Sequence, residues 1–266
     1  MTFLIVLGII FLIIAIILFF NERHQRGTVA SLRTAKSATV AELNQLAEAV
    51  SQDIGGGSWR DYVKVLGTIE CDRPLQSELS ATDCVYYTMS VTREYEETVT
   101  RTDSEGKRTT ETQHGSQVMS SNKRSVPFLL NDGTGTIEVS VDGATIDTET
   151  VLDEFRQESD RGGLISYGSF SLAVNAPSAG RRTLGYRYNE SVLPIGRRVL
   201  VVGMVSDQPG TLVLQKPTNP DHRFIVSFKT DDTLTTESDR AAKNTSLWMK
   251  ICLVVGAVLI LIGMLF

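Results

Sequence analysis

The sequence predicts an α+β protein in which two terminal transmembrane helices flank a β-rich domain with a small barrel-like sheet, a long hairpin arm and short helices. Three observations support this prediction. An apolar run stands at each end of the chain, the middle alternates between apolar and polar residues, and clusters of Gly, Asn and Asp separate the alternating stretches. Alternation with period two is typical of half-buried strands.

The two apolar runs are long enough to cross a bilayer. Residues 3–20 contain no polar side chain, and residues 247–266 are interrupted only by Lys250. At 1.5 Å per residue each run reaches about 30 Å, the thickness of a hydrocarbon core. The first run has no basic stretch before it and no small-x-small cleavage site after it, so we expect a retained anchor rather than a signal peptide.

Each span carries two small residues seven positions apart. Gly8 and Ala15 share one helix face in the first span, and Gly256 and Gly263 do so in the second. Small residues let two membrane helices approach closely. The sequence therefore allows the two spans to pack on each other, although Gly and Ala are also common in membrane helices for other reasons.

Basic residues lie on only one side of the two spans. They precede or follow the spans on the side of the central segment, at Arg23, Arg26, Arg33, Lys36, Lys229, Arg240 and Lys243. The positive-inside rule then predicts an integral membrane protein with two spans, its central domain on the cytoplasmic side and both termini on the opposite side.

A short helix and a joint come before the β-rich part. Residues 39–42 form a capping box, apolar residues then recur at helical spacing, and a Gly-Gly-Gly-Ser joint follows at residues 55–58. The predicted domains are a transmembrane helix at 1–20, a juxtamembrane helix and Gly-rich linker at 21–57, a β-rich domain at 58–232, a juxtamembrane segment at 233–246 and a transmembrane helix at 247–266.

Alternation and turn residues predict the elements of the central domain. A short helix is expected at residues 148–156 and a Gly- and Ser-rich loop at residues 160–180. Strands are expected at residues 62–69, 85–100, 124–130, 136–141, 198–205, 211–215 and 224–228.

One pair of strands has no apolar face. Residues 94–112 are polar on both faces and turn over near residues 103–106. Such a strand pair cannot belong to a core, so we expect an extended hairpin arm or partial disorder. An arm of this kind suits contact with another protein, by strand addition or by charge. The candidate contact residues are Glu94, Glu96, Glu97, Arg101, Ser104, Lys107 and Arg108.

Catalytic chemistry is not indicated. A net charge of −5 argues against a nucleic-acid binder. Cys71 and Cys84 cannot complete a zinc site alone and are expected to be buried, reduced thiols. His114 and Ser116 lie close together but outside any G-x-S-x-G elbow. We therefore predict no catalytic, cofactor-binding or metal-binding residue and no cofactor. A transfer enzyme would require Cys71 or Cys84 to be an exposed thiol with a low pKa.

An ordered set of short stretches points to a family. The set comprises residues 65–71, 74–75, 84–87 and 93–97, then residues 125–128 and 132–135, then residues 185–190, 193–196, 215–217 and 224–227. In this order they resemble the GIDE family, also called the BAM (besides-a-membrane) domain, which is the membrane-flanked module of MULAN- and MAPL-type E3 ubiquitin ligases. The resemblance covers residues 62–232 and implies the same membrane-hairpin architecture.

The sequence departs from those ligases in one respect. They carry a RING finger after the second span, which needs about eight Cys and His ligands, whereas this sequence has three Cys and three His. It therefore resembles a RING-less member of prokaryotic type. Recruitment of a ubiquitin-conjugating enzyme through a RING is not expected.

Three functions remain open. The leading hypothesis is a membrane-anchored protein-interaction or scaffold module without a catalytic site. Its partner would be another small membrane protein, such as a LemA-type protein, or a second copy of the chain. The family name implies an alternative, an E3 ubiquitin-ligase-like transferase component. A third hypothesis is an anionic-lipid or envelope-stress membrane protein that uses the basic residues beside the spans.

Overall fold

The computed structural model describes residues 2–57, 59–102, 108–158, 162–178, 180–207 and 211–265. The chain forms two compact units. Unit 1 contains Met1–Thr68, Leu130–Thr145 and Arg198–Phe266, and unit 2 contains Ile69–Leu129 and Ile146–Arg197. The chain passes between the units four times, so each is assembled from segments that are distant in the sequence.

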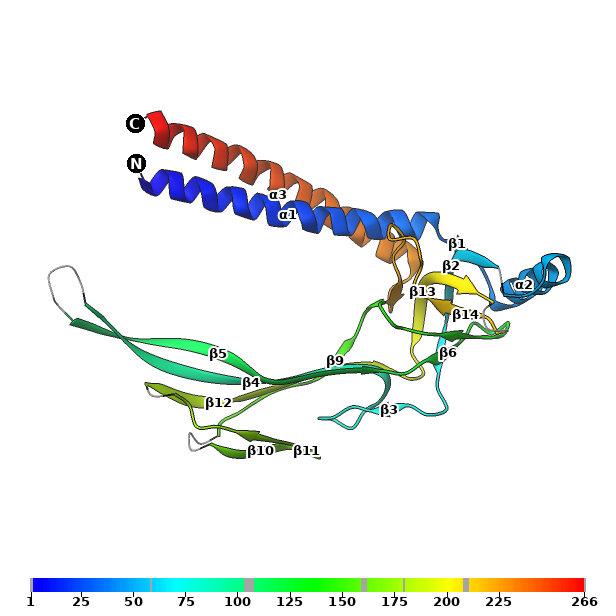
Figure 1. Ribbon diagram of the computed structural model, residues 1–266, viewed down its shortest axis with the longest axis horizontal. Coiled ribbons are helices and arrows are strands. Elements are labelled where there is room, and N and C mark those ends of the chain that lie inside the picture. The colour runs from blue at the N-terminus through cyan, green and yellow to red at the C-terminus, as the bar shows by residue number, and fades with distance from the viewer. Residues whose placement is uncertain are drawn as a thin grey trace. The chain divides into compact units, whose positions relative to one another are not determined.

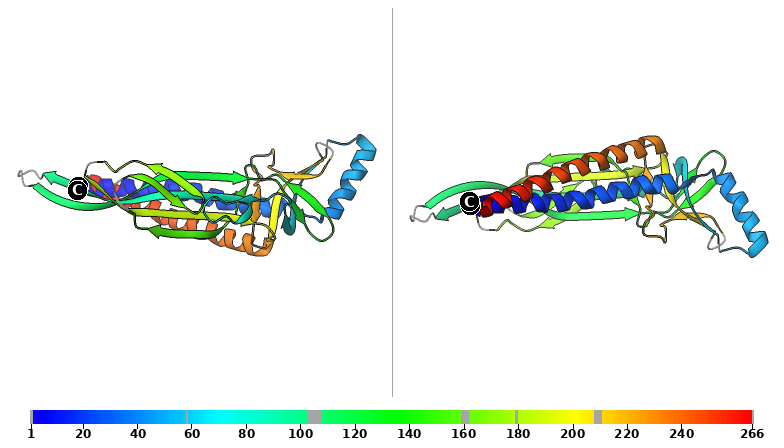
Figure 2. Two further views of the ribbon diagram at one scale, coloured as in Figure 1. Left: turned by 90° about the horizontal axis from the view of Figure 1, so that it is seen from below. Right: turned by 90° about the horizontal axis from the view of Figure 1, so that it is seen from above.

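Unit 1 contains the two long terminal helices. α1 (Thr2–Thr34) and α3 (Asp231–Leu265) lie side by side, with both chain ends at the same end of the pair (Figures 1 and 2). Each helix is long and apolar enough to cross a membrane. Both continue beyond their apolar runs as a polar pair of helices.

Small residues bring the backbones of α1 and α3 together. A Cβ added at Gly8 would lie 2.9 Å from the carbonyl oxygen of Gly256, and one added at Gly256 would lie 3.0 Å from that of Gly8. A Cβ at Gly263 would lie 2.8 Å from Ile5 Cγ1, and Ala15 is buried. The expectation that these small residues line a helix contact is confirmed.

Unit 1 also contains a closed barrel. β2 (Arg60–Glu70), β6 (Phe128–Asn131), β7 (Thr136–Val139), β14 (Val213–Gln215) and β13 (Arg198–Ser206) pair in this order, and β13 pairs back with β2 to close a five-stranded barrel. The barrel-like sheet predicted from alternation is therefore present. Further strands extend this sheet, namely β1 (Lys36–Ser37), β8 (Thr145–Ile146) and β15 (Ile225–Ser227).

The capping box predicts α2 correctly. α2 (Val40–Ile54) begins after Thr39, whose hydroxyl accepts the Glu42 N–H, while the Glu42 carboxylate accepts the Thr39 N–H at 2.8 Å. Beyond the helix, the joint is not free, because the N–H groups of Gly57 and Trp59 donate to the Asp207 carboxylate at 2.8 and 3.0 Å.

Unit 2 is a sheet with a covering hairpin. β3 (Leu75–Gln76), β4 (Asp83–Thr102), β12 (Arg181–Pro194) and β9 (Glu149–Arg156) follow one another across the sheet, and β5 (Arg108–Ser125) also pairs with β4. β10 (Gly163–Tyr167) and β11 (Phe170–Val174) form a separate hairpin. Its residues Ile165 and Val174 join Tyr87, Met89 and Tyr188 in one buried cluster.

Two expectations about unit 2 are wrong. Residues 148–156 do not form a helix, because β9 pairs with β12 from Glu149↔Val192 to Arg156↔Tyr186 and this pairing outweighs the helical spacing of Val151, Leu152 and Phe155. Residues 160–180 are not one loop, because residues 163–174 form the β10–β11 hairpin, which turns at Gly168 with a positive φ of 55°.

Candidate interaction surfaces

The predicted arm is the distal part of the β4–β5 hairpin. β4 and β5 pair from Tyr86↔Ser125 to Thr102↔Arg108. β12 accompanies β4 only as far as Arg181↔Glu97, and Figure 1 shows the β4–β5 hairpin continuing past the end of β12. We use "the ribbon" for the two-stranded part, Thr98–Thr102 with Arg108–Thr112. Its tip, residues 103–107, lies outside the described residues.

The three candidate glutamates do not form a bare acidic patch. Each pairs with an arginine of β12: Glu94 with Arg187 at 2.9 Å, Glu96 with Arg182 at 2.7 Å and Glu97 with Arg181 at 3.2 Å. The hydrogen bond from Arg182 is the main cause that lowers the pKa of Glu96. These glutamates therefore fasten β4 to β12 at the base of the ribbon.

The other candidates lie on the ribbon or beyond the described residues. Arg101 is exposed and stands opposite Thr109, and Arg108 is exposed and stands opposite Thr102. Ser104 and Lys107 lie outside the described residues. The structure thus brings Arg101 and Arg108 to the ribbon and keeps the glutamates at its base.

Sequence reasoning attended to the side chains of the arm and did not identify its exposed backbone edge. β5 has 18 residues, most of them exposed and none buried, and in the described part of the chain only β4 pairs with it. Gly115 of β5 lies under the ring of Tyr95, because a Cβ there would be 2.6 Å from Tyr95 Cζ. The signal for this edge was the length of a polar, Thr-rich stretch without proline.

The two thiols of unit 2 differ in environment. Cys84 is fully buried, and its Sγ lies 3.7 Å from the Leu75 carbonyl oxygen. Burial, followed by the charge of Glu190, raises its pKa to about 11. Cys71 is partly exposed, so its expected burial is wrong, and its Sγ lies 3.9 Å from the Pro127 carbonyl oxygen. The Cys84 thiol is thus the opposite of an activated nucleophile.

A buried carboxylate organises one loop of unit 2. Glu190 is fully buried on β12. Its oxygens accept hydrogen bonds from the hydroxyls of Ser77 and Ser80 and from the N–H groups of Leu79 and Ser80, all between 2.6 and 2.8 Å. These four hydrogen bonds to one buried side chain fix the loop that supplies the donors.

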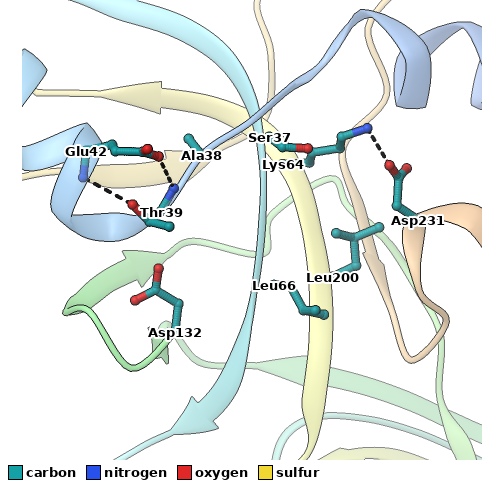
Figure 3. A pocket seen from close by; sticks show the side chains of 9 residues that line it. All are labelled: Ser37, Ala38, Thr39, Glu42, Lys64, Leu66, Asp132, Leu200 and Asp231. Atoms are coloured by element: carbon teal, nitrogen blue, oxygen red, sulfur yellow. Dashed lines mark hydrogen bonds and ion pairs between the residues drawn. The ribbon is translucent and has the colours of Figure 1, made fainter.

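A groove of about 360 Å³ lies in unit 1, between α2, the barrel and the start of α3 (Figure 3). Lys64 on β2 donates both to the Leu32 carbonyl oxygen of α1, at 3.0 Å, and to the Asp231 carboxylate of α3, at 2.5 Å. Lys64 therefore ties both long helices to the barrel. The lining residues are Ser37, Ala38, Thr39, Glu42, Lys64, Leu66, Asp132, Leu200 and Asp231.

The acidic residues of the groove already have partners within unit 1. Asp132 accepts the Val40 N–H at 2.8 Å and the Thr134 and Gly135 N–H groups. Burial raises the pKa of Asp132, but these hydrogen bonds together outweigh it and leave the pKa below its usual value. Glu42 caps α2, and Asp231 pairs with Lys64. The acidic side chains of the groove therefore hold α2, the barrel and α3 together and are not available as reactive groups. The described residues contain no group of three or more His, Cys, Asp or Glu side chains suited to a metal.

Comparison with known proteins identifies the family. The model of the GIDE family, described as E3 ubiquitin ligase, matches residues 96–262, a range that begins on β4 and ends inside α3. Searches of curated proteins and of solved structures find no match. The family match spans more than half of the chain and includes β5, β12, most barrel strands and the second candidate span. This chain therefore belongs to the GIDE family.

Proposed function

We propose that this protein is a membrane-anchored interaction module whose contact element is the β4–β5 arm. One observation supports this most directly: beyond Glu97 the hairpin continues as a two-stranded ribbon with no apolar face and no third strand in the described residues. An isolated two-stranded ribbon is at best marginally stable in water. A partner that binds the ribbon would supply the contacts that the ribbon lacks on its own.

The membrane anchor would be the α1–α3 pair. Both helices pass the length and hydropathy requirements for a span, and the basic residues beside them favour a cytoplasmic position for the barrel and the sheet. In this arrangement the arm would meet proteins of the cytoplasm or the cytoplasmic parts of neighbouring membrane proteins. Covalent labelling of an engineered cysteine at exposed Leu164 from each side of sealed vesicles would test this orientation.

A second candidate function follows from the family match. The family description supports a role within an E3 ubiquitin-ligase system. These 266 residues contain three Cys and three His, fewer than the roughly eight ligands of a RING, and the Cys84 thiol is buried. Within such a system we propose that this chain supplies binding and membrane attachment, while another component supplies the transfer chemistry.

Site-specific photo-crosslinking in native membranes tests the arm. A probe at Arg101, which is exposed on the ribbon, should give discrete protein adducts. The matched control is a probe at Leu164, which is 71% exposed in the same unit but on β10. A partner captured through Arg101 should also lose its association when residues 98–112 are replaced by a short turn. Equal labelling at Arg101 and Leu164, with full retention of partners by the shortened chain, would refute the proposal.

A further inference from the structure

The outer edge of β5 is unpaired over a long regular stretch. β5 is in register with β4 from Arg108 to Val118, and the first irregularity follows, where Thr92 faces Val118 but Val91 faces Ser120. Every residue of this stretch except Gly115 is exposed. In the described part of the chain, no strand other than β4 pairs with β5. Residues 108–118, called the free edge below, therefore present a continuous row of backbone donors and acceptors.

The free edge lacks the usual protection. Natural edge strands carry proline, lysine or bulges that prevent pairing with other strands. The free edge has no proline and no lysine, and its charged residues are Arg108 at one end and Glu111. The bulge and Lys123 come only after it ends. An exposed edge of this kind is a template for a further strand.

The character of the ribbon restricts what that strand can be. Both faces of the ribbon are polar, so an added strand must also be polar on both faces to avoid exposing apolar side chains to water. The free edge itself meets this condition. In an antiparallel pair of two free edges, residue i faces residue 226 − i when the twofold axis passes through Gln113, and the whole regular stretch is then used.

This register places compatible residues opposite each other. Gln113 faces its own copy, Thr112 faces His114, and Glu111 faces Gly115, so no like charges are opposed. Thr110 then faces Ser116, Thr109 faces Gln117 and Arg108 faces Val118. Moving the axis to Glu111 would bring two glutamates together, which is unfavourable. The Gln113 register is therefore the longest regular pairing without charge repulsion.

We propose that the free edge pairs antiparallel with the free edge of a second copy of this chain, about a twofold axis at Gln113. The inference rests on the proposed function, since it names the partner of the arm. The pairing joins the two β4–β5 hairpins edge to edge into one continuous sheet and satisfies the open backbone groups of both free edges. Attachment to one membrane raises the effective concentration of copies and aligns them, which favours a modest polar contact.

Cysteine crosslinking tests the register in the full chain in membranes. Gln113→Cys, in a background with Cys71→Ser and Cys252→Ala, should form a disulfide-linked dimer under a mild added oxidant, because facing Cα atoms are about 5 Å apart. Thr109→Cys is the matched control, on the same strand and face. Its two copies would be about 27 Å apart in this register. Equal or no crosslinking from the two variants would overturn the proposal.

A charge variant tests the same contact without a cysteine. Gln113→Lys puts two lysines opposite each other at the axis and should lower dimerisation several-fold, whereas Thr109→Lys faces neutral Gln117 and should change it little. Both positions are exposed, so neither variant should disturb the fold. If Arg101 photo-adducts contain only other proteins and Gln113→Cys gives no dimer, self-pairing is wrong while the arm remains a contact element. If Arg101 gives no adduct at all, the proposed function itself fails.

Discussion

The two halves of β4 belong to one strand and share one partner, β5, yet they are held in different ways. In the first half, Tyr87, Met89 and Val91 are buried between the sheet and the β10–β11 hairpin. In the second half, Glu94, Glu96 and Glu97 make ion pairs with β12, and the Thr98 N–H donates to the Gly180 carbonyl oxygen at 3.1 Å. Beyond Thr98, β5 is the only strand of the described residues that pairs with β4.

The difference shows what holds each half in place. Burial of aromatic and aliphatic side chains gives the first half several kcal/mol of stabilisation per large side chain. Exposed ion pairs and polar cross-strand pairs contribute little, typically under about 1 kcal/mol each. The first half of β4 thus stabilises the fold through buried side chains. The second half is held by weaker polar contacts and keeps an exposed surface that a partner can bind. The following changes test this contrast.

The largest effect is expected from the core. Tyr188 of β12 pairs with Val91 in the first half of β4 and is fully buried against Tyr167, with ring centroids 4.9 Å apart. Tyr188→Ala should lower the free energy of unfolding by about 3–5 kcal/mol, because a large cavity is created. Tyr95→Ala, the control on the arm, removes a partly exposed ring that lies over Gly115 and under the Arg181 guanidinium, 4.6 Å from the ring centroid, and should cost clearly less. Urea unfolding in detergent measures both. Equal losses would show that the two halves are equally important for the fold.

The buried carboxylate should come next. In Glu190→Gln, an amide N–H₂ replaces one oxygen that now receives donors from Ser77, Leu79 and Ser80. Donors then face donors in a buried site, so the expected loss is about 2–4 kcal/mol. Glu96→Gln is the matched substitution on the exposed half and should leave unfolding nearly unchanged. If Glu190→Gln left the free energy of unfolding unchanged, the loop would not depend on this carboxylate.

Thiol labelling compares the halves without changing the core. Cys84 begins β4 and is buried with a pKa of about 11, so at pH 8 only about one thiol in a thousand is ionised. An engineered Thr100→Cys on the exposed half of the same strand should react far faster with a water-soluble reagent. In denaturant the two rates should converge. Fast labelling of native Cys84 would reopen the hypothesis of a reactive thiol.

Local patterns predicted the elements that depend on local chemistry. The capping box at Thr39 and Glu42 located α2, the apolar runs located α1 and α3, and alternation located β2, β4 and β13. The arm followed from the absence of an apolar face. In each case the signal and the structure it specifies lie within the same short segment.

Features that depend on distant segments could not be predicted in this way. β9 has an amphipathic spacing that also suits a helix, and only its pairing with β12 makes it a strand. Closure of the barrel requires β13 to pair with β2, which is remote in the sequence. Glu190 lies in an Asn-Glu-Ser triplet typical of a surface, and its donors at Ser77–Ser80 come from another part of the chain.

The smallest effect is expected at the ion pairs that fasten the second half of β4 to β12. The Arg182 hydrogen bond lowers the pKa of Glu96 in the folded chain, so its contribution is present above the ordinary pKa of a glutamate and is lost as the pH falls through the lowered value. Arg182→Ala should raise the pKa of Glu96, as measured by NMR titration of its carboxyl carbon, and should let amide exchange in the arm increase at a higher pH than in the unmodified chain. The control is Arg101→Ala, which removes an exposed arginine further along β4. It should change neither the pKa of Glu96 nor the pH at which amide exchange in the arm increases. If acidification released the first half of β4 together with the arm, the two halves would form one cooperative unit, and the arm could not open independently to accept a partner strand.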